Sequence, residues 1–177
     1  SEIEKAEEDV KRLIKENEEL NRRSEETSRK LVEENERLNK EVEDRVRKLI
    51  KELEDNGAPE EKLRRAMERI KKLVEDSKEH SRKVAKEDRD LNEESKRHTD
   101  RVAEEIKRLI DDLRRSTDDD VVRRILKRIE DLSRKNKRDI EEVNKESERL
   151  SRENKKKIKD VLEEIRRLVE RIEREVR

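Results

Sequence analysis

The stretch that decides the fold is LIKENEELN at residues 13–21, which returns as LVEENERLN at residues 31–39. The rest of the chain carries two more such duplications: LVEDSKEHS (73–81) with LNEESKRHT (91–99), and LSRKNKRDI (132–140) with LSRENKKKI (150–158). Each second copy follows the first after eighteen residues. Because eighteen residues make five turns at 3.6 residues per turn, the repeat returns each side chain to one face of a nearly straight α-helix.

The hydrophobic pattern around these copies also has helical spacing. Mostly apolar residues recur about every 3.6 positions in three segments, at residues 3–53, 63–113 and 122–172. We call the residues at these positions, including the polar ones, stripe residues, because they form a stripe along one face of a helix. A half-buried β-strand would instead alternate at every second position. We therefore expect three helices of nearly equal length.

Two short breaks, at about residues 55–58 and 116–117, separate these helices. Gly57, the only glycine, stands where a left-handed residue ends a helix, and Pro59, the only proline, stands at the first helical position of the next. Ser116-Thr117 offers a hydroxyl N-cap ahead of three aspartates, which face the positive end of the helix dipole. Loops this short require antiparallel neighbours.

These features predict an all-α fold, a single-chain antiparallel three-helix bundle with up-down-up order and long, nearly straight, coiled-coil-like helices. We expect one domain over residues 1–177, with helices at about 2–54, 59–115 and 118–176. The stripe is wide enough for each helix to contact two neighbours, which predicts a monomer that requires no partner.

The composition excludes several classes of function. The chain has 52 basic and 52 acidic residues, 59% charged residues, 27% hydrophobic residues, no aromatic residue and no cysteine. The balanced charge and missing aromatic side chains argue against a nucleic-acid partner. The apolar runs are too short for a membrane span or a signal peptide, so we expect a soluble protein with no targeting signal. Disorder is the rival interpretation of so much charge, and the helical period argues against it.

The two loops give an approximate helix register. If Leu53 faces Leu63 and Leu113 faces Val122, paired residue numbers add up to about 116 across the first loop and about 235 across the second.

On this register the polar stripe residues gather in three layers. The first layer comprises Asn17, Asn21, Ser95, His98, Thr99 and Asn136, with Ser133 just beyond it. The second layer comprises Asn35, Asn39, Ser77, His80, Ser81 and Asn154, with Ser151 in the same relation. The central layer comprises Ser24, Ser28, Asp88, Asn92, Asn144 and Ser147.

The first and second layers are copies at the eighteen-residue offset, whereas the positions eighteen residues from the central layer hold apolar residues such as Val10, Ile70 and Ile129. A buried polar group without a partner costs about 1–3 kcal/mol, so these residues must satisfy one another. A slipped pairing would bury them against aliphatic side chains. We interpret the layers as buried networks that specify helix register.

Three of these residues also invite a chemical interpretation. His80 and His98 lie about 27 Å apart on one helix, so they cannot share a metal ion, and neither has an orienting carboxylate and oxyanion site for catalysis. We expect no catalytic, cofactor-binding or metal-binding residue and no enzymatic activity. With no clear anionic partner, the histidines offer a pH-responsive alternative. For Asp88, two possibilities stay open: a rim carboxylate turned to water, or a buried one that accepts hydrogen bonds from Ser28, Ser147 and Asn92.

The chain resembles the de novo designed helical bundles with buried hydrogen-bond networks. The shared features are helices of equal length, idealised caps, an exact repeat, a surface of Glu, Lys and Arg, and a core with layers of Asn, Ser and His. Spectrin-like three-helix repeats are similar in shape, but they usually carry aromatic core residues, which this chain lacks. The resemblance implies no substrate or cofactor. It implies a structural scaffold, with a pH-responsive switch or a helix-binding or assembly module as the alternative.

Overall fold

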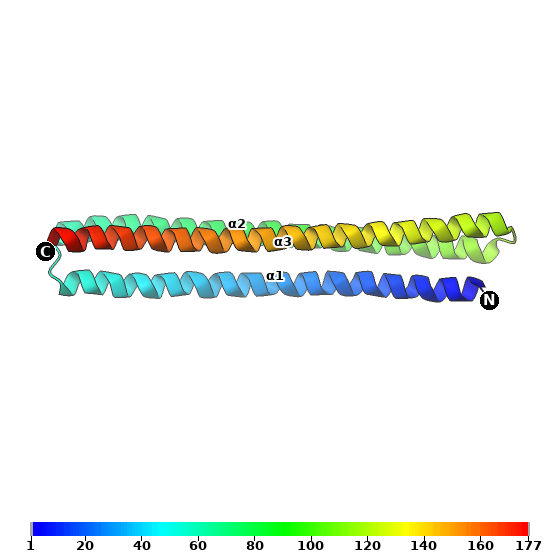
Figure 1. Ribbon diagram of the computed structural model, residues 1–177, viewed down its shortest axis with the longest axis horizontal. Helices are drawn as coiled ribbons and strands as arrows, with labels where there is room; N and C mark the ends of the chain where they lie inside the picture. Colours follow the sequence, from blue (N-terminus) through cyan, green and yellow to red (C-terminus); the bar gives the residue numbers. More distant parts are fainter. Residues whose placement is uncertain (1, 177) are drawn as a thin grey trace. The chain divides into compact units, whose positions relative to one another are not determined.

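The computed structural model describes residues 2–176, which form three α-helices and no strand: α1 (Glu2–Asp55), α2 (Glu60–Arg115) and α3 (Asp119–Val176). Figure 1 shows the helices joined in chain order by two short loops. The predicted all-α three-helix bundle is confirmed, and the observed helix bounds lie within one residue of the predicted ones.

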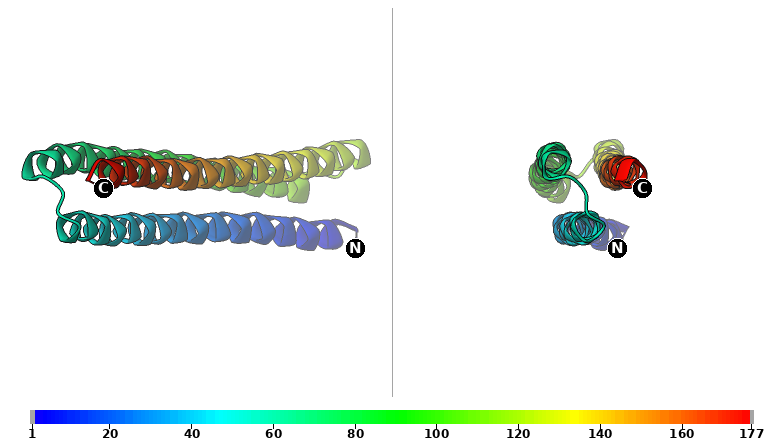
Figure 2. Two further views of the ribbon diagram at one scale, coloured as in Figure 1. Left: turned by 60° about the vertical axis from the view of Figure 1, so that its left-hand side comes forward. Right: turned by 90° about the vertical axis from the view of Figure 1, so that its left-hand side faces the viewer.

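Packing divides the chain into two compact units, each made from one part of every helix. Unit 1 comprises Ser1–Ser28 and Asp88–Ser147, and unit 2 comprises Arg29–Glu87 and Glu148–Arg177. Within each unit, hydrogen bonds join α1 to α2, α2 to α3 and α3 to α1. The loop that joins α1 to α2, which lies in unit 2, can be followed in both views of Figure 2. The single domain expected over residues 1–177 stays a prediction.

Each unit has its own apolar core, supplied by the stripe residues. In unit 1 the core is formed by Val10, Val102, Ile106 and Ile129. In unit 2 it is larger and is formed by Val42, Val46, Leu53, Ala66, Ile70, Leu73, Ile158, Val161, Ile165, Val169 and Ile172. Full burial of one such aliphatic side chain stabilises the fold by about 1.5–3 kcal/mol, so these clusters supply the main driving force for helix association.

The end of α1 shows why the only glycine stands at position 57. Gly57 has a φ of 78°, and its N–H donates to the Glu54 carbonyl at 3.1 Å. The next N–H, of Ala58, donates to the Leu53 carbonyl at 3.0 Å, and both Ala58 and Leu53 pack in the unit 2 core. This pattern is a Schellman motif with its accompanying hydrophobic contact, so the predicted left-handed glycine is confirmed.

The starts of α2 and α3 differ in detail from the prediction. The Pro59 carbonyl accepts the Leu63 N–H at 3.0 Å, so Pro59 occupies the N-cap and not the first helical position. At α3 the predicted hydroxyl cap is wrong: Asp118 Oδ1 accepts the Asp120 N–H at 2.9 Å. An aspartate at this position both accepts a hydrogen bond and places a negative charge at the positive end of the dipole, which a hydroxyl cannot do.

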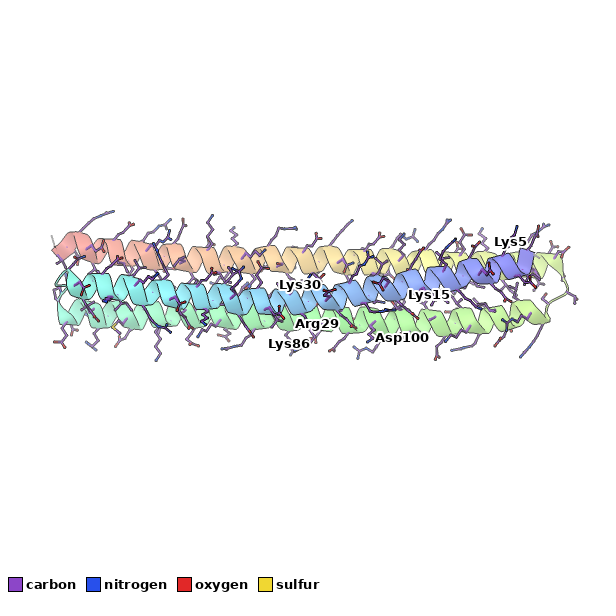
Figure 3. The ribbon with its side chains drawn as sticks, turned by 90° about the horizontal axis from the view of Figure 1, so that it is seen from below. Lys5, Lys15, Arg29, Lys30, Lys86 and Asp100 are labelled. Carbon is purple, nitrogen blue, oxygen red and sulfur yellow. The ribbon has the colours of Figure 1, made fainter. Side chains whose placement is uncertain are left out.

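Charged side chains such as Lys15 and Asp100 project outward from the helices (Figure 3).

In unit 1, hydrogen bonds from Arg114 hold the pKa of Glu7 below its ordinary value, and in unit 2 a hydrogen bond from Lys62 holds the pKa of Glu175 below its ordinary value. Because both folded-state pKa values are depressed, these pairs stabilise the fold above the unfolded carboxyl pKa of about 4.3 and lose that effect as the pH falls. Exposed pairs contribute little and are screened by salt.

We predict that Gly57→Ala lowers the free energy of unfolding by about 1–2 kcal/mol, because a β-carbon is strained in the left-handed region. An added Cβ at this position meets no atom within 4 Å, so the loss reflects backbone strain alone. Urea denaturation measures the loss. Gly57→Asn is the matched control and should lose less, since asparagine tolerates this conformation; equal losses for the two variants would contradict the explanation.

Candidate functional site: the buried polar layers

The structure places the predicted layer residues inside the units. All eighteen are buried except Ser28, His80, His98 and Asn144, which are partly exposed. The first and central layers belong to unit 1 and the second layer belongs to unit 2. Ser133, which the register placed just beyond the first layer, is also buried, and Ser151 is partly exposed.

In the first layer a chain of hydrogen bonds crosses all three helices. Ser95 Oγ on α2 donates to Asn21 Oδ1 on α1 at 3.2 Å, and Asn21 Nδ2 donates back to Thr99 Oγ1 at 2.5 Å. Thr99 Oγ1 then donates to Asn136 Oδ1 on α3 at 3.3 Å. We call this series the relay. Asn17 lies outside it, because its Nδ2 donates to the main-chain carbonyl of Ser133 at 3.2 Å.

The second layer contains the same relay. Ser77 Oγ donates to Asn39 Oδ1 at 2.9 Å, Asn39 Nδ2 donates to Ser81 Oγ at 2.9 Å, and Ser81 Oγ donates to Asn154 Oδ1 at 3.0 Å. One further bond returns to α1, from Asn154 Nδ2 to Asn35 Oδ1 at 2.5 Å. Each relay residue is the eighteen-residue counterpart of one in the first layer, and donors and acceptors match bond for bond.

The relays also test the helix register. Asn21 with Ser95 and Asn39 with Ser77 obey the numbering rule for the first loop. Thr99 with Asn136 and Ser81 with Asn154 obey the rule for the second. The register predicted from the loop ends is therefore confirmed within each unit.

The central layer is connected differently. Asp88 is 1% exposed, which excludes the rim position turned to water. Its Oδ2 accepts hydrogen bonds from Ser28 Oγ and, at 3.5 Å, from Asn92 Nδ2, whereas Ser147 donates none to it. In the same layer Ser24 Oγ donates to Asn144 Oδ1, which joins α1 to α3.

Not every buried polar atom in the layers is satisfied. Among the described residues, six buried atoms have no hydrogen-bond partner: Asn35 Nδ2, His80 Nε2, Asp88 Oδ1, Asn92 Oδ1, Ser133 Oγ and Ser147 Oγ. The expectation that the layer residues satisfy one another therefore holds for the relays and fails at these atoms. Three of the six belong to the central layer.

The histidines depart from the prediction. Both are partly exposed, and the relay bonds use only Asn, Ser and Thr atoms. His98 Nε2 lies 3.4 Å from Asp139 Oδ2, so the expectation that it lacks an anionic partner is wrong. Asp139 was not among the predicted layer residues, although it stands one helical turn after Asn136 and near His98 on the predicted register. The counterpart of Asp139 after eighteen residues is Lys157, so the second layer does not repeat this pair.

Among residues 2–176, no group of three or more His, Asp or Glu side chains is arranged to hold a metal ion. None of the described helices is long and apolar enough to cross a membrane. No protein-family model, curated protein or solved structure matches the chain.

We predict different effects for two Ser→Ala substitutions, one in the first layer and one just beyond it. Ser95→Ala should lower the free energy of unfolding by about 1–3 kcal/mol, because it leaves Asn21 Oδ1 without its donor in a buried position. Ser133→Ala should be neutral or stabilising, because it removes a buried hydroxyl that has no partner. Denaturant titrations of both variants compare them directly. A destabilisation by Ser133→Ala as large as that by Ser95→Ala would contradict this assignment of the network.

Proposed function

We propose that this chain is a structural scaffold of designed origin, a monomeric three-helix bundle whose buried polar layers specify how its helices pair. We assign it no catalytic activity and no natural substrate. The observation that carries the proposal is the relay, which recurs with the same donors and acceptors in two layers of different units.

The relays favour one local pairing of α2 with α3. A slip of three residues along α2 would bring Val102 opposite Asn136 in place of Thr99, and Val84 opposite Asn154 in place of Ser81. Both valines are buried, so each asparagine oxygen would lose its donor to an aliphatic side chain. The penalty is about 1–3 kcal/mol for each unsatisfied group, and it applies in both layers at once.

The relays do not disfavour a slip of α2 by eighteen residues along α3, because such a slip brings equivalent residues together. The central layer, which does not repeat, supplies the missing discrimination. After a slip of this length Asp88 would lie opposite Ile129, so a buried carboxylate would face an aliphatic side chain. Repeated and unrepeated layers therefore play complementary roles, the first in local pairing and the second in absolute register.

The alternatives have weaker support. A pH switch needs an imidazole within a network, and the relays contain none. A helix-binding module needs an open apolar surface, and the exposed large apolar side chains in the described chain are Val32 and Met67, at 40% and 46%. Both line grooves between α1 and α2 of unit 2, amid charged residues such as Lys78. These two functions stay predictions.

We predict that replacing one polar residue of the central layer on each helix by an aliphatic residue removes the unique register. The triple variant Ser28→Val, Asp88→Ile and Ser147→Ile gives this layer the residues found eighteen positions away on each helix. The variant should stay helical and resist denaturant better, because aliphatic groups replace the Asp88 carboxylate and the Ser147 hydroxyl, each of which has a buried oxygen without a partner. Since the short loops oppose slipping within one chain, staggered pairing should appear between chains, as a mass that grows with protein concentration in light scattering.

The parent should scatter as one chain of 21.6 kDa at all micromolar concentrations. Asp88→Asn keeps the layer polar and is the control; it should also stay monomeric. A triple variant that remains a monomer, with the same unfolding cooperativity as the parent, would show that the central layer does not specify register.

A further inference from the structure

The central layer holds three oxygen atoms that the protein leaves unused. Asp88 Oδ1, Asn92 Oδ1 and Ser147 Oγ are buried and have no hydrogen-bond partner among the described residues. Their side chains are 1%, 5% and 6% exposed, respectively. All three atoms can accept a hydrogen bond or coordinate a cation.

The contacts of Asn92 explain why its oxygen is open. Asn92 Nδ2 donates to the main-chain carbonyl of Asp88 at 3.0 Å and also to Ser28 Oγ. These bonds fix the amide orientation and direct its nitrogen toward Asp88 and Ser28. The amide oxygen is consequently the atom left without a partner, one helical turn from the Asp88 carboxylate.

The helix register brings Ser147 to the level of Asp88. Thr99 and Asn136 are hydrogen-bonded across α2 and α3 at 3.3 Å. Eleven residues before Thr99 is Asp88, and eleven residues after Asn136 is Ser147. Because eleven residues are close to three helical turns and the helices are antiparallel, the register places Asp88 and Ser147 at the same level along α2 and α3.

Charge sets Asp88 apart from every other buried residue. It is the one ionisable side chain among the buried residues of the described chain, and no Lys, Arg or His of that chain pairs with it. The bonds from Ser28 and Asn92 satisfy one carboxylate oxygen and leave the other without a partner. Burial without a cationic partner penalises the ionised form of a carboxyl group, so a positive ligand at this position would be favoured.

We propose that Asp88 Oδ1, Asn92 Oδ1 and Ser147 Oγ form a binding site for one monovalent alkali cation. Carboxylate, amide carbonyl and hydroxyl oxygens are the ligands that hard cations take in proteins. One bound cation of charge +1 neutralises the single carboxylate and supplies a partner to all three open oxygens. An anion is excluded by the carboxylate, and a water molecule would leave the charge of Asp88 uncompensated.

The test compares urea unfolding in NaCl, KCl and tetramethylammonium chloride at one ionic strength. Equal ionic strength screens the surface ion pairs equally, so a difference between salts reports specific binding. The parent should unfold at higher urea in NaCl or KCl than in tetramethylammonium chloride, whose cation is too large for a buried site. Once the cation exceeds its dissociation constant, a further tenfold rise should lower the unfolding equilibrium constant by about tenfold.

Two variants separate the site from general salt effects. Asp88→Asn keeps the side-chain shape and removes the charge, so it should lose the cation-specific increment. Asp100→Asn removes an exposed carboxylate from the same helix and should keep it. Equal increments in the parent and in Asp88→Asn would overturn the proposal, as would a parent that responds identically to all three salts.

A crystal of the parent grown or soaked in RbCl gives a second readout that does not depend on any variant. An anomalous peak within coordination distance of Asp88 Oδ1 is the expected result. Ordinary water density at that point without an anomalous signal would overturn the proposal and assign the three open oxygens to a buried water.

Discussion

A polar side chain inside a helix bundle must find a hydrogen-bond partner or destabilise the fold by about 1–3 kcal/mol. In this protein that constraint acts at Asn21 and Asn39, which are buried at 6% and 8% exposure between the helices. Each accepts from one α2 hydroxyl and donates to another, so both functional ends of the amide are used on a single neighbouring helix. The pairing of α1 with α2 therefore depends on matching amides with hydroxyls, which apolar packing alone does not require.

Apolar packing and polar matching have different roles. The unit 2 core contains many more buried aliphatic residues than the unit 1 core, which shares its unit with two of the three polar layers. Aliphatic side chains drive association but tolerate sliding, since one valine or isoleucine packs nearly as well as the next. The relays supply directionality, and the central layer breaks the eighteen-residue repeat. Stability and uniqueness are thus assigned to different residues of the same stripe.

Much of this could be predicted from the sequence because helical period, loop chemistry and repeat length are local properties. Setting Leu53 opposite Leu63 and Leu113 opposite Val122 at the loop ends was enough to pair Ser95 with Asn21 and Thr99 with Asn136. What the sequence did not determine was which of two equivalent-looking residues enters a network. Asn17 and Asn35 are exact counterparts, yet Asn35 accepts a side-chain bond from Asn154 and Asn17 bonds to a main-chain carbonyl. The eighteen-residue repeat does not distinguish the two positions, and the cap at Asp118 and the pairing of His98 with Asp139 likewise depend on side-chain contacts that the repeat does not specify.

The central claim is that equivalent hydrogen bonds in the two relays stabilise the pairing of the helices by similar amounts. A pair of double-mutant cycles tests this claim most directly. One cycle combines Asn39→Ala with Ser81→Ala, and the other combines Asn21→Ala with Thr99→Ala, with unfolding free energies measured for every single and double variant. The account predicts favourable coupling in both cycles, within the range of about 0.5–3 kcal/mol seen for residues that share a network, and of similar size because the two bonds are equivalent. A coupling free energy near zero in either cycle would show that the hydrogen bonds of the relays do not hold the helices in register.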